Sequence, residues 1–160
     1  MASRGGTSGG RSVLIAVDGS DNAKSAFRWY LKWSRRQDDT VTFFNVLEPP
    51  SLPTFSISNP SSIPTDEWGT ILASRVEAAR KLEDDYIAEA QAAGLKFEYI
   101  SQPAERIGEA IIKQAEKQAA HVIILGTRGL GPIRRTFLGS VSDYVLHQGV
   151  VPVTVVPNGI

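Results

Sequence analysis

The chain has 160 residues, of which 42% are hydrophobic and 21% charged, a composition typical of one globular domain with a sizeable core. Its 17 basic residues balance 17 acidic ones, so no excess charge favours nucleic acid or an anionic membrane, and we expect neither as a partner. The chain has no cysteine and only two histidines, which excludes disulfides, thiol catalysis and thiolate metal sites, and we expect no dedicated metal site.

The first residues are rich in glycine and serine and lack the apolar core of a signal peptide. No apolar run reaches the length of a membrane span. We therefore expect a soluble protein of the cytoplasm, or of the nucleus. Residues 1–11 are predicted to form a disordered tail, and residues 12–160 a single domain.

The first half of the chain predicts two strands and two helices. Residues 13–17 are rich in β-branched side chains and read as a buried strand, which ends at Asp18-Gly19-Ser20, a turn that can cap a helix. Helical spacing follows over 22–36, then a strand over 40–47. Residues 49–65 form a Pro/Ser-rich loop, either a surface insertion or a cover over a ligand, and residues 66–93 read as a long amphipathic helix.

The second half continues the alternation. We expect a strand over 95–100, a helix over 103–118 opened by Pro103, and a strand over 121–125. A helix over 139–147 and a last strand over 150–156 complete the chain. Alternating strands and helices predict an α/β fold, a single three-layer α/β/α domain with a five-stranded parallel sheet. Strand order 3-2-1-4-5 would bring the turns after strands one and four into one crevice, where such sheets bind ligands.

The turn after the fourth strand carries the most specific pattern. Gly126, Gly129 and Gly139, followed by Ser140, leave backbone N–H groups open to an anion such as phosphate. The pattern is not a Walker A loop, because no Gly-Lys-Ser/Thr step occurs. Nor is it the dinucleotide fingerprint, because Arg134 replaces the third glycine. The alternative is a glycine-rich turn that only closes a tight corner.

The spacing of these glycines resembles that of the ATP-binding subgroup of the universal stress protein family: Gly, two residues, Gly, nine residues, Gly, then Ser or Thr. AVDGS at residues 16–20 and VVPVTVVP at residues 150–157 are also similar to that family, in plant-like single-domain members. One departure is His121, where the family carries an acid. The resemblance implies a Rossmann-like fold, similar to that of the adenine nucleotide alpha hydrolases, that binds ATP or AMP in stress responses.

From this resemblance we expect the nucleotide to be bound by Ala16, Val17, Asp18, Val46, Gly126, Arg128, Gly129, Gly139, Ser140, Val141 and Ser142. Asp18 either accepts hydrogen bonds from ribose or adenine, or only caps the next helix. Val46 either offers its backbone to adenine or packs in the core. Ala16 is small and lies on the same strand face as Asp18, which leaves room for the base.

The phosphates would lie against the amides of Gly129, Gly139, Ser140 and Val141, with hydroxyl donors from the serines. We expect one of Arg128, Arg134 and Arg135 to contact the ligand, because guanidinium groups suit phosphate. Mg²⁺ or Mn²⁺ could be held through the phosphate oxygens.

No nucleophile and base can be paired from the sequence, so we expect no catalytic residue and favour a nucleotide-dependent dimeric switch over an enzyme. A slow ATPase and a chaperone-like interaction protein remain alternatives. The family resemblance implies a homodimer formed through the last strand, residues 150–156. Pro152 in that strand is either tolerated at a sheet edge or blocks pairing there.

Overall fold

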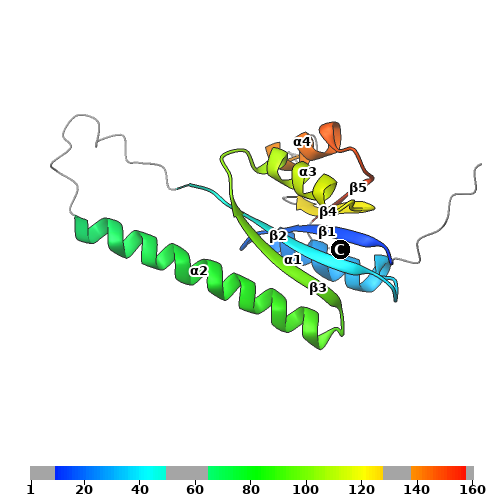
Figure 1. Cartoon of the computed structure of the whole chain (residues 1–160), viewed down its shortest axis with the longest axis horizontal. Helices are drawn as coiled ribbons and strands as arrows, with labels where there is room; N and C mark the ends of the chain where they lie inside the picture. Colours follow the sequence, from blue (N-terminus) through cyan, green and yellow to red (C-terminus); the bar gives the residue numbers. More distant parts are fainter. Residues whose placement is uncertain (1–9, 50–64, 128–137, 158–160) are drawn as a thin grey trace, which may run out of the picture.

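The computed structural model describes residues 10–49, 65–127 and 138–157. Five parallel strands form one sheet in the order β3-β2-β1-β4-β5, which confirms the predicted fold class and strand order (Figure 1). The strands are β1 (Ser12–Val17), β2 (Thr40–Leu47), β3 (Lys96–Pro103), β4 (Val122–Thr127) and β5 (Val153–Pro157).

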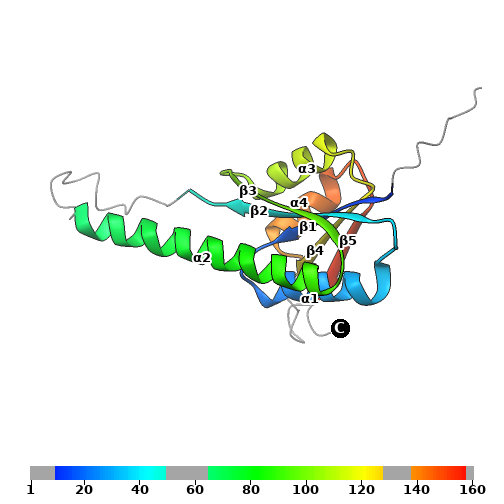
Figure 2. The same ribbon diagram turned by 60° about the horizontal axis from the view of Figure 1, so that its bottom comes forward.

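Helices cover both faces of the sheet. One face carries α1 (Asp21–Trp29), its π-helical continuation η1 (Tyr30–Ser34), and α2 (Thr65–Ala92). The other face carries α3 (Ile107–Lys117) and α4 (Ser140–Gln148), and Figure 2 shows the sheet between the two layers. Across the described ranges, none of the helices has both the length and the apolar character that a membrane span requires.

Strand alternation divides the core into two clusters. In β1, Val13 and Ile15 face α1 and α2, whereas Leu14 faces α3 and α4. On the first face, Phe27 of α1 meets Phe43 of β2 edge to face, with 4.9 Å between ring centroids. The strands therefore combine two apolar faces, as expected for a parallel sheet covered on both sides.

Helix α2 is longer than the sheet it covers. Its C-terminal half buries Tyr86 and Ala90 against β2 and β3, and Tyr86 lies 5.3 Å from Phe43 between ring centroids. Its earlier half projects past the sheet (Figures 1 and 2). Leu72 and Val76, which belong to the same apolar stripe, are therefore 47% and 53% exposed.

Two predicted boundaries are wrong. Pro103 does not open a helix but ends β3, paired with Leu47, and α3 begins at Ile107. A proline is tolerated there because β3 is an edge strand. The last strand begins at Val153 rather than at residue 150. Of the predicted loop, residues 50–64 lie outside the described residues, and Thr65 already belongs to α2.

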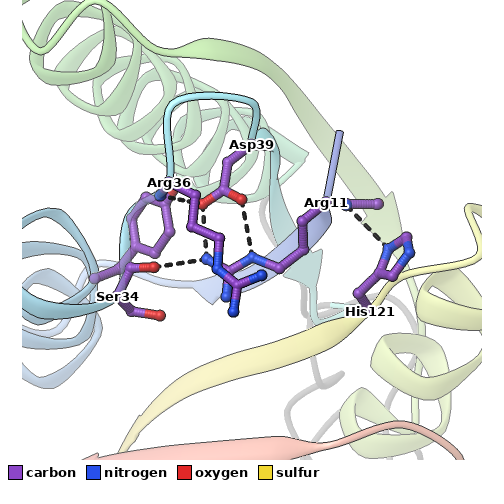
Figure 3. A network of polar contacts seen from close by, with 7 residues as sticks. Arg11, Ser34, Arg36, Asp39 and His121 are labelled. Carbon is purple, nitrogen blue, oxygen red and sulfur yellow. Dashed lines mark hydrogen bonds and ion pairs between the residues drawn. The ribbon is translucent and has the colours of Figure 1, made fainter. Parts of the chain in front are cut away.

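An ion-pair network closes the edge of the sheet where β1, β2 and β4 begin (Figure 3). The Arg11 guanidinium donates to both oxygens of Asp39, at 2.8 and 2.7 Å, and to the carbonyl of Ser34 at 2.6 Å. Arg11, which we assigned to the tail, is therefore fixed to the domain, while residues 1–9 of that tail lie outside the described residues.

The same network contacts a π-helical turn, η1, that the sequence did not indicate. The N–H of Arg35 donates to the carbonyl of Tyr30, five residues earlier, at 2.9 Å. The hydroxyl of Tyr30 donates to Asp39 at 2.8 Å. Close by, His121 accepts a hydrogen bond at Nδ1 from the N–H of Ser12 at 3.1 Å, which is a structural role.

Candidate functional site

The candidate site lies at the opposite edge of the sheet, where the strands end. Asp18 directly follows β1, and Ser20 begins α1 as its N-cap. The Asp18 Oδ1 accepts hydrogen bonds from both the N–H of Ser20, at 2.9 Å, and its hydroxyl, at 2.5 Å. The side chain that caps α1 is therefore Ser20, whose Oγ accepts from the N–H of Ala23 at 3.3 Å. Asp18 orients the turn instead of capping the helix itself.

Strand β4 approaches α1 at Gly126, one residue before the strand ends. A Cβ atom on Gly126 would lie 2.2 Å from the carbonyl oxygen of Asn22, in the first turn of α1. Only glycine allows this approach, so Gly126 has a packing role whatever ligand it meets. Its carbonyl accepts a hydrogen bond at 3.4 Å from the hydroxyl of Ser142, which is itself only 5% exposed.

The start of α4 is built differently. Its N-cap is Gly139, which has no side chain to cap the helix, and a Cβ atom there would meet none of the described residues within 4 Å. The first N–H groups of an α-helix have no acceptor within the helix. The amides at Ser140 and Val141 thus present the positive end of the helix dipole to any anion placed there.

A cavity of about 160 Å³ lies between these elements. It brings together Asp18, which follows β1, Val46 from β2, and Gly126 from β4 with the first turn of α4. Of the predicted residues it is lined by Ala16, Val17, Asp18, Val46, Gly126, Val141 and Ser142. Gly139 and Ser140 adjoin it at the start of α4 but are not part of the lining. Arg128, Gly129, Arg134 and Arg135 lie outside the described residues.

Other lining residues were not predicted. Phe44 lies on the same face of β2 as Val46, so strand alternation could have indicated it. Ile107 and Ile111 come from α3, four residues apart, and only the tertiary structure brings that helix to this edge. The remaining residues of the lining that we did not predict are Ser20, Ala23, Glu48 and Leu125. The cavity thus has an apolar wall between carboxylates and a helix N-terminus.

A larger cavity, of about 860 Å³, opens on the other face of the sheet, between α2 and the ends of β2 and β3. Of the predicted site residues that the structure describes, its lining includes only Val46. It also lies under the projecting half of α2, where Leu72 and Val76 are exposed. The smaller cavity is the better candidate, because the chemistry that the sequence singled out converges there.

Comparison with known proteins identifies the family of the chain. Residues 10–157 match the Universal stress protein family. The chain belongs to this family. A universal stress protein of Thermus aquaticus is 31% identical over 147 residues, which cover 91% of this chain and 98% of that protein. A relative from Mycolicibacterium smegmatis is 26% identical, and the aligned residues span about half of its length, 47%, and 90% of this chain.

Solved structures share the fold of this universal stress protein. A family protein from Arabidopsis thaliana with AMP bound superposes with a TM-score of 0.68 at 16% identity, over 92% of this chain and 91% of that one. A universal stress protein in complex with cAMP gives a TM-score of 0.57 at 22% identity, over 93% of this chain and 98% of that one. At these identities the likeness concerns the fold.

Proposed function

We propose that this universal stress protein binds an adenine nucleotide, ATP or AMP, in the cavity at the carboxyl edge of the sheet. The observation that carries the proposal is the polarity of the cavity. Asp18 and Glu48 line it from the β1 and β2 ends, and the N-terminus of α4 closes it from the β4 side. Carboxylates accept from hydroxyl and amino groups, whereas a helix N-terminus attracts an anion. A nucleotide carries donors at its base and ribose and an anion at its other end.

The apolar lining supports the same ligand. Ala16, Val46 and Ile111 offer a surface for a flat ring between the two polar ends. A volume of about 160 Å³ suits a base with part of its ribose rather than a whole nucleotide, so the phosphates would lie outward, towards Gly139 and Ser140. Gly129 and Arg128 belong to the phosphate end of this proposal on sequence grounds. If the ligand is ATP, Mg²⁺ or Mn²⁺ would be held by its phosphate oxygens.

The proposal is supported by the relatives that contain AMP or cAMP, which share the fold. It is tested by calorimetric titration and thermal unfolding with AMP, ATP, adenosine and phosphate. Ligand at one hundred times its dissociation constant stabilises the folded state by about 2.7 kcal/mol. For a chain of this size that free energy raises Tm by roughly 5–10 °C.

A charge-matched pair of variants locates the site. Asp18→Asn should weaken binding of both AMP and adenosine, because the lost carboxylate faces the base and ribose. Asp38→Asn removes an exposed carboxylate at the opposite edge of the sheet and should bind as the unmodified protein does. Absence of binding at millimolar AMP and ATP would refute the proposal. Steady phosphate release from ATP would instead favour the slow ATPase.

We also propose that the protein acts as a homodimer through β5, with the nucleotide controlling its assembly or shape. β5 is an edge strand, and the carbonyl of Pro152 accepts from the N–H of Ile123 in β4 at 2.9 Å. The N–H and carbonyl of one strand residue point to the same side, so the donor that Pro152 lacks would have faced β4 rather than the open edge. Val153 and Val155, the next odd-numbered residues, direct their backbone groups outward.

Two substitutions at Val155 test pairing through this edge, because they separate loss of the backbone N–H from loss of side-chain volume. Val155→Pro should abolish a dimer seen by sedimentation, because it deletes an outward N–H, and an edge strand tolerates proline at such a position. Val155→Ala shortens the same side chain but keeps the donor, so it should remain dimeric. A dimer that survives Val155→Pro, or a monomeric unmodified protein, would contradict the β5 interface.

A further inference from the structure

Ser20 occupies an unusual position between the candidate ligand site and helix α1. Its hydroxyl takes part in two hydrogen bonds, donating to Oδ1 of Asp18 at 2.5 Å and accepting from the N–H of Ala23 at 3.3 Å. Its own N–H donates to the same Oδ1 at 2.9 Å. Both Asp18 and Ser20 line the cavity, although Asp18 is exposed and Ser20 only half-buried.

We propose that Ser20 is a positioning residue of the nucleotide site, which holds the Asp18 carboxylate in one orientation before the ligand arrives. This inference rests on the proposed function. A serine hydroxyl has a single proton to donate, and Ser20 gives it to Asp18. Ser20 therefore has no hydroxyl proton left for the ligand and acts through Asp18.

The two oxygens of the Asp18 carboxylate have different surroundings. Oδ1 accepts two hydrogen bonds from Ser20. Among the described residues, no hydrogen bond engages Oδ2, so this oxygen is the acceptor left for a ribose hydroxyl or an adenine amino group. Because Ala23 N–H holds the Ser20 oxygen, the orientation of the carboxylate is tied to the first turn of α1. A group fixed in advance loses less conformational entropy when the ligand binds.

The alternative is that Ser20 serves only as the N-cap of α1. Three substitutions separate the two roles. Ser20→Thr keeps the hydroxyl and should bind AMP as the unmodified protein does. Ser20→Gly removes the hydroxyl, yet glycine is accepted at an N-cap with little loss of helix stability. We expect Ser20→Gly to weaken AMP and adenosine binding by about three- to tenfold, since one side chain must then be ordered on binding. Ser20→Ala should lose both affinity and thermal stability.

A double-mutant cycle with Asp18→Ala decides whether Ser20 acts through Asp18. Affinities for AMP are measured by calorimetry up to millimolar ligand in the full chain. In the Asp18→Ala background, Ser20→Gly should cause no further loss, because there is no carboxylate to orient. An equal loss with and without Asp18, or an unchanged affinity in Ser20→Gly alone, overturns the positioning role while leaving nucleotide binding intact. If the unmodified protein binds neither AMP nor adenosine, this inference and the proposed function both fail.

Discussion

Arg11 and Asp39 form a two-pronged ion pair that ties the residue before β1 to the residue before β2, with Nε–Oδ1 and Nη2–Oδ2 distances of 2.8 and 2.7 Å (Figure 3). The Asp39 side chain is 1% exposed, and it also accepts from the hydroxyl of Tyr30 and the N–H of Arg36. This carboxylate therefore joins two strand starts to the π-helical turn, at the edge of the sheet remote from the candidate site.

Removing that carboxylate should be strongly destabilising. Asp39→Ala removes the charged partner of the partly buried Arg11 guanidinium and the acceptor of the Tyr30 hydroxyl, and we expect a loss of about 3 kcal/mol in the free energy of unfolding. Urea denaturation of the variant and of the unmodified protein measures this loss. Asp38→Ala, next to it but exposed, should change stability by no more than about 0.5 kcal/mol. Similar losses in the two variants would show that the ion pair is not specifically stabilising.

The same pair predicts an acid-dependent stability. Burial opposes ionisation of Asp39, but the hydrogen bonds from Arg11, the N–H of Arg36 and Tyr30 outweigh it and lower the pKa of the folded carboxyl. As the pH falls below the ordinary aspartate pKa of about 4, the unfolded chain binds the proton first, so this stabilising contribution is lost towards the lower folded pKa.

The measurement is the free energy of unfolding between about pH 3 and pH 7, a range that brackets the ordinary aspartate pKa of the unfolded chain. Asp39→Asn should be less stable at neutral pH and should approach the unmodified protein as the pH falls. Asp38→Asn serves as the control and should keep the acid slope. Parallel curves for Asp39→Asn and the unmodified protein would contradict the assignment of this slope to Asp39.

Substitution by serine should affect the stability of the fold differently at two glycines of the family pattern. Gly126→Ser forces a side chain into the carbonyl of Asn22 and should destabilise the fold by about 1–3 kcal/mol. Gly139→Ser adds a favourable N-cap at a position where no described residue lies within 4 Å of the new Cβ atom, and it should leave stability unchanged or slightly raised. Thermal unfolding without nucleotide tests both. A stable Gly126→Ser variant would contradict the close approach of α1 and β4.

The buried end of α2 allows a test of packing in the core. Tyr86 is 2% exposed, and its hydroxyl has no hydrogen-bond partner within the described part of the chain. Tyr86→Phe should therefore leave stability unchanged or raise it by up to about 1 kcal/mol, whereas Tyr86→Ala should lose about 3–5 kcal/mol. Val76→Ala, on the exposed part of the same stripe, should cost no more than about 0.5 kcal/mol. A clear loss in Tyr86→Phe would indicate a hidden partner for the hydroxyl.

The sequence predicted every strand, because alternating and helical periodicities repeat clearly along the chain. The strand order, expected for the fold that the chain resembles and not from periodicity, is also confirmed. The prediction from the sequence was wrong where one local sequence feature is compatible with two different structures. Pro103 suits both the first turn of a helix and the end of an edge strand, and the pairing with β2 decided for the strand. The apolar stripe of α2 indicated a helix correctly, but not that Leu72 and Val76 would extend past the sheet.

For the site, the sequence by itself determined which chemistry is present: an aspartate after the first strand, and glycines with serines before the last helix, in the spacing of one family. That information is local, because each element is short and continuous. The tertiary structure alone decided that Ile107 and Ile111 of α3 close the cavity, that Ser20 rather than Asp18 caps α1, and that Gly126 is required by Asn22. Those relations join residues on different elements, and their distances are fixed by the packing of helices on the sheet, which no periodicity encodes.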